Sequence, residues 1–347
     1  MENAATLRSP LGPWDGIDER PNAPASKLRD GLNIVFRDGL VSRRPGRTHV
    51  AADLNGRRVA GLHEYVNEFG VRKVVAYMDE EPGGYTPGGL VELNWNTGAL
   101  TEIAGPADVQ PVPDGEFSIS ANIDGHLVIA EPGGKLLDFD GYTLSLLAAV
   151  AGIDAGVAAE TYLSSPPGAR FLAVWRDRLI AAGDPNAPRL IGLSENKWAT
   201  ANIPDTAPIG GANVWPVRTN FDLTTEEGDI VVNVTVLADR LVVLGRTGVA
   251  VVDEDSVAPY ARIVARQHGC IAPRSVVNVG DRVFYLGEGA IYSFRGDGSQ
   301  VISAPLSRTM SEVIDWDQAY KAVAVNLRRA REYRIWVPVR GRLGNCL

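Results

Sequence analysis

The chain has 347 residues, of which 45% are hydrophobic and 22% charged, and it contains 37 glycines and 22 prolines. This composition excludes global disorder and favours many short strands joined by tight turns over long helices. The formal net charge is −8. Residues 1–60 and 320–347 are net basic, at +3 and +6, whereas residues 61–319 carry −17. The acidic middle of the chain disfavours non-specific nucleic-acid binding, because the negatively charged phosphate groups are attracted only to positively charged surface.

The chain carries no disulfide framework and no targeting segment that the sequence reveals. Its two cysteines, Cys270 and Cys346, are too few for a disulfide scaffold and match no metal-ligand spacing. The N-terminal segment lacks the apolar core of a signal peptide. The most apolar window, residues 144–153, is far shorter than a membrane span. We expect a soluble protein that is made in a cytoplasm and does not span a membrane.

Residues 1–31 are predicted to form an extended arm. Prolines at positions 10, 13, 21 and 24 exclude a continuous helix or a central strand. Trp14 and Ile17 are the apolar anchors of this arm, which we expect to lie across the surface of its own chain or of a neighbour.

Residues 32–50 contain a hairpin signal. In "NIVFRDGLVSR" two apolar runs flank Asp38-Gly39, a pair that favours a type I′ turn. Arg43, Arg44 and Arg47 lie beside this turn. These arginines fit a contact with DNA or an acidic partner, and equally well the solvated edge of a strand.

Three groups of strand-like runs follow, and each has the size of one propeller blade. They cover residues 58–104, 117–148 and 170–203, with a connection at 149–168. Residues 204–228 are an insertion rich in Pro, Gly and Thr that contains Trp215 and Phe221. Insertions of this kind map to loops on one face of a propeller, which is often the binding face.

Residues 229–306 contain a tandem repeat. "DIVVNVTVLADRLVVLGRTGVAVVDEDS" and "SVVNVGDRVFYLGEGAIYSFRGDGS" align with Asp239-Arg240 on Asp281-Arg282 and Gly245 on Gly287. The offset of about 42 residues is typical of one four-stranded blade. One such sheet cannot bury both of its faces, so blades must stack on neighbours.

The chain ends in a short segment followed by a hairpin. Residues 307–319 are predicted to form a short helix with Ser307 as its N-cap, and residues 320–338 give half of a sixth blade. Because a bare sheet edge is a liability, we expect the hairpin at 32–50 to close this last blade; the alternative is that the chain is part of a longer protein. The predicted fold is all-β, a six-bladed β-propeller over residues 32–347 with an extended N-terminal arm.

No motif in the sequence carries chemistry. The closest potential ligand pair is His268 and Cys270, which lacks further donors and fits a turn between blades better. Short acidic turns fit hairpin capping better than a calcium site, and no nucleophile–base spacing stands out. We therefore expect no catalytic residue, no metal and no cofactor. A polysaccharide-processing or carbohydrate-binding propeller is the alternative, since acidic pairs and tryptophans are available.

Two stretches of the chain resemble a known family. They are "GLNIVFRDGLVSRRPGRTHV" and "HGCIAPRSVVNVGDRVFYLGEGAIYSFRGDGSQVISAPLSRTMSEVI". With "LADRLVVLGRTGVAVVD", they are similar to the tail hub or nozzle proteins of short-tailed double-stranded DNA bacteriophages. The matching elements include the Gly269–Ala272 turn and the Ile302–Leu306 run, and the resemblance covers about a third of the chain.

The resemblance implies a structural virion protein without enzymatic activity. Such proteins are six-bladed propellers that assemble as a ring, usually a hexamer, beneath the portal and adaptor. The ring forms part of the DNA exit channel, contacts the passing genome non-specifically, and carries tail fibres or spikes. Related hubs continue beyond the propeller, so the resemblance also implies a tip domain that is missing here or supplied by a separate protein. The residues expected in assembly and partner contacts are Trp14, Ile17, Arg43, Arg44, Arg47, Trp215 and Phe221.

Overall fold

The structure of the chain is a computed structural model that consists almost entirely of antiparallel β-sheets. It describes residues 34–37, 40–43, 59–78, 89–94, 96–105, 116–147, 163, 166–196, 215–216, 219–223, 229–254, 259–328, 332–341 and 345–346. No helix in these ranges is long and apolar enough to cross a membrane.

Five four-stranded sheets follow one another along the chain, each with its strands hydrogen-bonded in chain order. The first sheet contains β3 (Val59–Val66), β4 (Arg72–Met78), β5 (Gly89–Leu93) and β6 (Leu100–Glu102). The second contains β7 (Ile119–Ile123), β8 (His126–Ala130), β9 (Leu136–Phe139) and β10 (Leu144–Leu146). The third contains β11 (Phe171–Trp175), β12 (Arg178–Asp184), β13 (Ala187–Asn196) and β14 (Phe221–Asp222).

The tandem repeat forms the next two sheets, as the sequence predicts. The fourth sheet contains β15 (Val231–Leu237), β16 (Arg240–Gly245), β17 (Gly248–Glu254) and β18 (Pro259–Arg266). The fifth contains β19 (Val277–Val279), β20 (Arg282–Gly287), β21 (Ala290–Phe294) and β22 (Ser299–Val301). The last sheet has three described strands, β23 (Val323–Leu327), β24 (Glu332–Pro338) and β25 (Asn345–Cys346).

Helical segments are short and lie in the connections between sheets. They are η2 (Pro273–Ser275), η3 (Ala304–Leu306), α1 (Ser307–Val313) and η4 (Trp316–Lys321). The prediction that Ser307 caps α1 is wrong. Leu306 is the N-cap and makes no side-chain cap, because η3 runs directly into α1 and leaves no extended residue before it.

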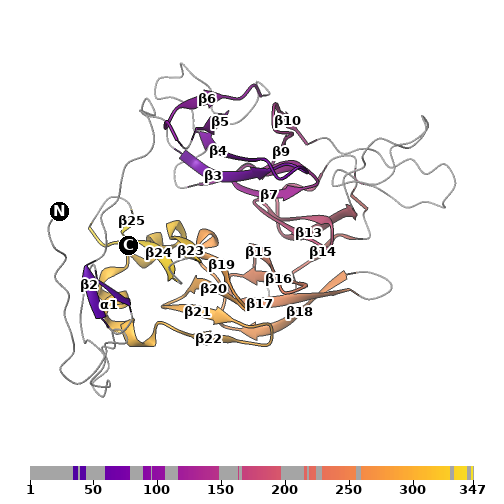
Figure 1. The fold of residues 1–347 in the computed structure, drawn as a ribbon. Helices are drawn as coiled ribbons and strands as arrows, with labels where there is room; N and C mark the ends of the chain where they lie inside the picture. Colours follow the sequence, from indigo (N-terminus) through magenta and orange to yellow (C-terminus); the bar gives the residue numbers. More distant parts are fainter. Residues whose placement is uncertain are drawn as a thin grey trace, which may run out of the picture.

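The sheets follow one another round an arc that begins with β3–β6 and ends with β23–β25 (Figure 1). The first strands of successive sheets contact one another along much of this arc, as β3 and β7, β7 and β11, or β19 and β23 do. A succession of four-stranded antiparallel sheets that pack face to face in this way is a β-propeller-like architecture. Its closure into a ring of six blades stays a prediction.

Each pair of consecutive sheets shares an apolar core. Strand residues point alternately to the two faces of a sheet, so one set of buried side chains meets the preceding sheet and the other meets the following sheet. Five clusters result: first with second, second with third, third with fourth, fourth with fifth, and fifth with last. In the first of these, the rings of Tyr65 and Phe139 meet edge to face at 5.1 Å.

Asparagine side chains tie several first strands to the preceding sheet. The side-chain amide of Asn122 donates to the Glu64 carbonyl at 2.7 Å, and its oxygen accepts from the Val66 amide at 3.0 Å. Asn278 donates to the Val236 carbonyl at 2.9 Å. These bonds satisfy backbone groups that the ladders of the sheets leave open, so they fix the spacing of neighbouring sheets.

The third sheet differs from the prediction. The sequence predicts this blade over residues 170–203, of which 197–203 lie outside the described residues. The structure completes the sheet with β14, whose two residues pair with Leu190 and Ile191 of β13. This strand comes from the predicted loop insertion at 204–228, so that segment supplies part of the sheet.

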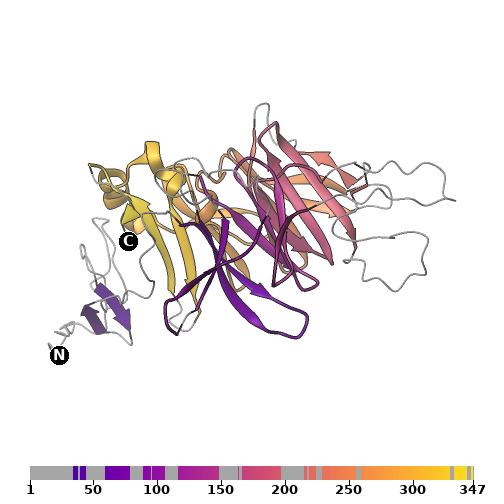
Figure 2. The ribbon, with the colours of Figure 1, turned by 90° about the horizontal axis from the view of Figure 1, so that it is seen from above.

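The N-terminal hairpin stands apart from the sheets. Strands β1 (Ile34–Arg37) and β2 (Leu40–Arg43) pair with Arg37 opposite Leu40, which is the register of a two-residue turn. Among the described strands they form a sheet of their own, and Figure 2 shows this sheet separated from the arc. Closure of the last blade by this hairpin therefore stays a prediction. The arm at residues 1–31 lies outside the described part of the chain.

Candidate functional site: a cavity at one end of the first strands

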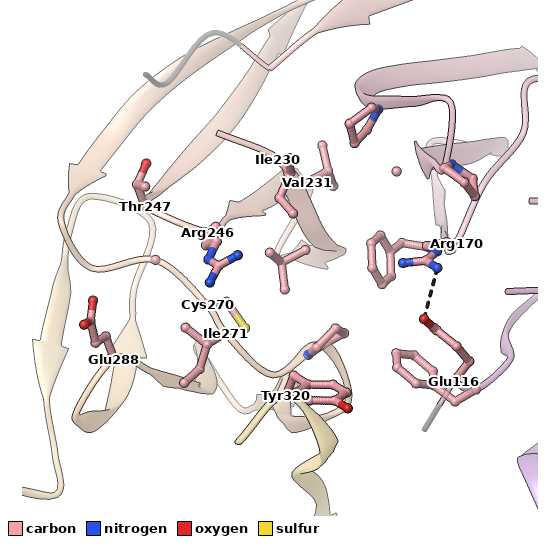
Figure 3. Close-up of a pocket in the computed structure, with 18 of the residues that line it drawn as sticks. Glu116, Arg170, Ile230, Val231, Arg246, Thr247, Cys270, Ile271, Glu288 and Tyr320 are labelled. Carbon is pink, nitrogen blue, oxygen red and sulfur yellow. Dashed lines mark hydrogen bonds and ion pairs between the residues drawn. The ribbon is translucent and has the colours of Figure 1, made fainter. Parts of the chain in front are cut away.

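A cavity of about 1030 Å³ opens where the first strands of four successive sheets begin (Figure 3). Part of its wall comes from segments that lead into β11, β15, β19 and β23. These segments contribute Arg170, Ile230, Ile271, Pro273 and Tyr320. The turns between second and third strands supply the rest, through residues such as Pro185, Arg246 and Glu288. Segments far apart in the sequence thus converge at one end of the first strands.

Apolar side chains form much of the wall. They include Phe117, Phe171, Val231, Ile271 and Trp316. A concave site with apolar walls and a few polar groups is the usual form of a ligand pocket. On shape and lining, this cavity is therefore the leading candidate site in the described part of the chain.

Two guanidinium groups lie on opposite walls of the cavity, as Figure 3 shows for Arg170 and Arg246. Arg170 is engaged: it donates to the Glu116 carboxylate at 3.1 Å and to the Pro132 carbonyl at 3.2 Å. Arg246 is exposed, and its side chain makes no hydrogen bond or ion pair within the described residues. The available positive group in the cavity is thus Arg246.

The turn that carries Arg246 is held by Asp229, a buried carboxylate. One Asp229 oxygen accepts from the Thr247 amide at 3.1 Å and the other from the Thr247 hydroxyl at 2.9 Å. A side chain at Gly245 would collide with this carboxylate. A glycine and an aspartate at these positions therefore fix where the Arg246 guanidinium projects.

A contact next to the cavity crosses the interior of the arc. The Arg274 guanidinium lies 4.5 Å from the ring centre of Phe117. Arg274 is in η2, which leads into the fifth sheet, and Phe117 precedes the second sheet. These sheets are not neighbours in the arc, so this cation–π contact spans the middle of the molecule.

The cysteine in the cavity wall is inert. Cys270 is fully buried and is a free thiol. Burial raises the pKa of this thiol to about 12, and a thiol that stays protonated is a poor nucleophile. Its neighbour His268 packs on the Tyr292 ring at 5.1 Å between ring centres. No group of three potential metal ligands occurs in the described residues.

Of the residues predicted from sequence to make contacts, the three that the structure describes, Arg43, Trp215 and Phe221, do not line this cavity. Trp14, Ile17, Arg44 and Arg47 lie outside the described residues. Arg43 ends β2, where its backbone pairs with Ile34. These five positions belong to the arm and the hairpin.

The two aromatic residues of the insertion serve the core of the chain. Trp215 is fully buried among residues of the second and third sheets. Phe221 lies in β14 and packs against the core between the third and fourth sheets. A fully buried side chain offers no surface to a partner, so the tryptophan acts in folding.

Apart from the Gly269–Ala272 turn, the residues that line the cavity were not singled out from the sequence. Arg170 and Ile230 each stand directly before the first strand of a sheet, and Arg246 stands directly after the second strand of another. The only sequence signal for these residues was their position directly before a first strand or directly after a second strand. The residue types gave no such signal, because Arg, Phe and Glu occur at many other turns.

The sheet order and the cavity define the class as an all-β, β-propeller-like protein with a central pocket. No family model matches the chain, and no curated protein sequence matches it. Among solved structures, YCF48 from Cyanidioschyzon merolae is similar with a TM-score of 0.39 and 10% identity, over 72% of this chain and 86% of that one.

Two further structures show similarity at a lower level. A complex of BBS1N with ARL6DN, soaked with lead, matches with a TM-score of 0.33 and 12% identity, over 82% of this chain and 75% of that chain. The extracellular domain of the putative one-component system BT4673 from B. thetaiotaomicron matches with a TM-score of 0.26 and 11% identity, over 86% of this chain and 42% of that one. Similarity this weak adds nothing to the sheet order, and it says nothing about function.

Proposed function

We propose that this protein is a structural component of a bacteriophage tail, in which copies form the nozzle or hub ring of a short-tailed double-stranded DNA phage. The ring, with six copies the expected number, forms part of the DNA exit channel below the portal and adaptor proteins. It also serves as the platform to which tail fibres or spikes attach. The protein is made in the host cytoplasm and located in the virion.

The observation that carries this proposal is where the motifs of the sequence resemblance lie in the fold. Gly269–Ala272 is the connection between the fourth and fifth sheets. The Cys270 amide donates to the Gly245 carbonyl at 2.9 Å, and the Ile271 amide donates to the Leu286 carbonyl at 3.0 Å. This turn therefore hydrogen-bonds to both sheets that it joins.

The second motif has the same kind of position. Ile302–Leu306 follows β22, and the Ile291 amide donates to the Ser303 hydroxyl at 2.9 Å. Pro305 then lies in η3, which leads into α1 and on toward the last sheet. Both motifs set the path of the chain from one sheet to the next, so the stretches whose sequence resembles tail hubs lie in connections between sheets.

Two physical properties agree with a conduit. The middle of the chain carries −17, and an acidic surface does not hold phosphate groups, so a genome passes without being bound. The contact between Arg274 and Phe117 spans the interior of the arc. A duplex would therefore pass between copies of the chain, in the lumen of a ring.

Particle composition tests this proposal directly. Quantitative peptide mass spectrometry on density-purified phage particles should find this chain at one ring's worth of copies for each portal ring. Imaging of those particles should then place a β-propeller-like density below the portal. Absence of the chain from purified particles would overturn the proposal.

The alternative is a propeller that binds or processes carbohydrate, and the cavity is the observation in its favour. Phe117, Trp316 and Tyr320 offer aromatic surface, and Glu116 and Glu288 lie on different walls. A carbohydrate site needs aromatic rings that stack on sugars and carboxylates that accept hydrogen bonds from sugar hydroxyl groups. Release of reducing sugar from capsule or cell-wall material, or saturable glycan binding that Trp316→Ala abolishes, would favour this alternative.

A further inference from the structure

The first sheet presents an apolar face that no other sheet covers in the described structure. His63 and Tyr65 of β3 point toward the second sheet, so Leu62 lies on the opposite face with its register partner Ala76 and with Val91. We call this side the first end face. Among the described residues its core cluster, Ala76, Met78 and Val91 with Leu100 packed against it, belongs to the first sheet alone, and the first three of these are buried.

The first end face is open along its innermost strand. The exposed fraction is 58% for Leu62 and 40% for Val59, both in β3. At the other end of the arc, Val325 of β23 is 37% exposed. Its neighbour Asn326 points the other way, where it donates to the Asn278 carbonyl of the fifth sheet at 2.9 Å. Both ends of the arc therefore expose apolar side chains where every interior pair of sheets shares a core.

The same chain carries a hairpin that joins none of the other described sheets. The β1–β2 hairpin pairs only with itself among the described strands, and an isolated two-stranded hairpin is marginally stable at best in water. Half of its ten residues are apolar: Ile34, Val35, Phe36, Leu40 and Val41. A hairpin of this composition needs an apolar face to pack on.

Charge and reach fit a contact with another copy. Residues 34–47 carry Arg37, Arg43, Arg44 and Arg47 against one aspartate, whereas the body of the chain is strongly acidic. The segment 44–58 joins the hairpin to β3 and, at about 3.4 Å per residue, spans up to roughly 50 Å. Figures 1 and 2 both place the hairpin away from the first sheet of its own chain, beyond the last sheet.

We propose that the β1–β2 hairpin of one copy packs on the first end face of a second copy, over Val59 and Leu62. Each chain then gives a hairpin on the side of its last sheet and receives one at its first sheet. Such a head-to-tail contact closes into a ring when the rotation between copies allows it. The inference rests on the proposed function in one respect: both require that copies of this chain associate with one another.

Cysteine pairing between different copies tests this contact. Two preparations carry Cys346→Ser and either Leu62→Cys or Ser42→Cys, while Cys270 stays buried. After mixing, a short bis-maleimide should link one chain of each kind into a covalent dimer. Each preparation alone should give no link at these positions.

Two results of the pairing experiment would overturn the inference. One is a link that forms only within a single chain of the Leu62→Cys, Ser42→Cys double variant and never in the mixture. The other is no link in a mixture that sedimentation shows to be oligomeric. A chain that stays monomeric at every concentration reached would overturn it as well.

A matched pair of substitutions measures the contribution of the face. Leu62→Arg places a charge on the first end face, and Leu146→Arg places one on β10, where the leucine is 41% exposed. We expect Leu62→Arg to weaken self-association about tenfold or more in sedimentation velocity, the scale set by losing one buried leucine. Leu146→Arg should leave it unchanged, and both variants should unfold like the parent chain. Equal association of the two variants would contradict the inference.

The failure of this inference is distinguishable from failure of the proposed function. If the chain is absent from phage particles but its copies link through positions 62 and 42, the proposed function fails and the inferred contact stands. A chain that is present in the tail but does not link through these positions assembles by another surface.

Discussion

The protonation of His63 gives the sharpest test of the packing between the first and second sheets. Its imidazole lies in β3 and is 7% exposed. The two ring nitrogens are 2.8 Å from the Ser118 hydroxyl and 2.9 Å from the Ser120 hydroxyl, which belong to the segment and strand opposite. Burial lowers the pKa of His63 from 6.5 to about 4.

The sign and size of the pH effect follow from that shift. Between pH 6.5 and pH 4 the unfolded chain binds a proton at His63 that the folded chain does not bind, so stability falls as the pH is lowered. Above pH 6.5 both states are neutral and the stabilisation is fully present. At about 1.4 kcal/mol for each pH unit, the total loss across this window is about 3 kcal/mol.

His63→Gln removes the titration while keeping a polar side chain. Urea unfolding at pH 7 and pH 4.5 should show the parent chain losing about 2 kcal/mol more than the variant, since most of the window lies between these values. The variant also identifies the His63 signal among the four histidines in an NMR titration. Parallel pH profiles for the two proteins, or a His63 signal that titrates near pH 6.5, would refute the reasoning.

Three further predictions concern the connections between sheets. Gly269→Ala should lower the free energy of unfolding by about 1–3 kcal/mol in urea titrations, because the new methyl group overlaps the Arg246 carbonyl, whereas Gly133→Ala, in open space, should have little effect. Asn122→Ala should cost about 1–2 kcal/mol in the same assay, since it removes two hydrogen bonds to the first sheet. Cys270 should react with a maleimide only above the unfolding transition, as mapped by its peptide, because the thiol is buried and its pKa is raised to about 12. Rapid labelling of the folded chain would contradict the buried position.

The strands were predictable from the sequence where the turns have strong local signals. Asp124-Gly125 separates β7 from β8, and both residues adopt the positive φ angles, 47° and 82°, that this pair tolerates best. Strand-like runs and such turns placed all four strands of the first and second sheets and the first three strands of the fourth and fifth, whereas β18 and β22 were not singled out. Local chemistry decides these elements, so no knowledge of tertiary contacts was needed.

The parts that could not be predicted depend on long-range packing. β14 has only two residues, and it pairs with β13 because Phe221 packs into the core between the third and fourth sheets. No local pattern marks so short a strand. The cavity is the same kind of case, since Phe117 and Arg274 are 157 positions apart in the numbering of the chain and meet only once the sheets have stacked.

The contact between Arg274 and Phe117 also bears on where a DNA duplex would pass if this protein is part of a conduit. Because it joins sheets that are not neighbours, side chains cross the interior of one chain beside the cavity. Any lumen wide enough for a duplex must then be made by several copies, and its width is set by how those copies join. Under the proposed contact, the exposed Leu62 on the first end face and the separate hairpin would set how copies join and hence the size of such a ring.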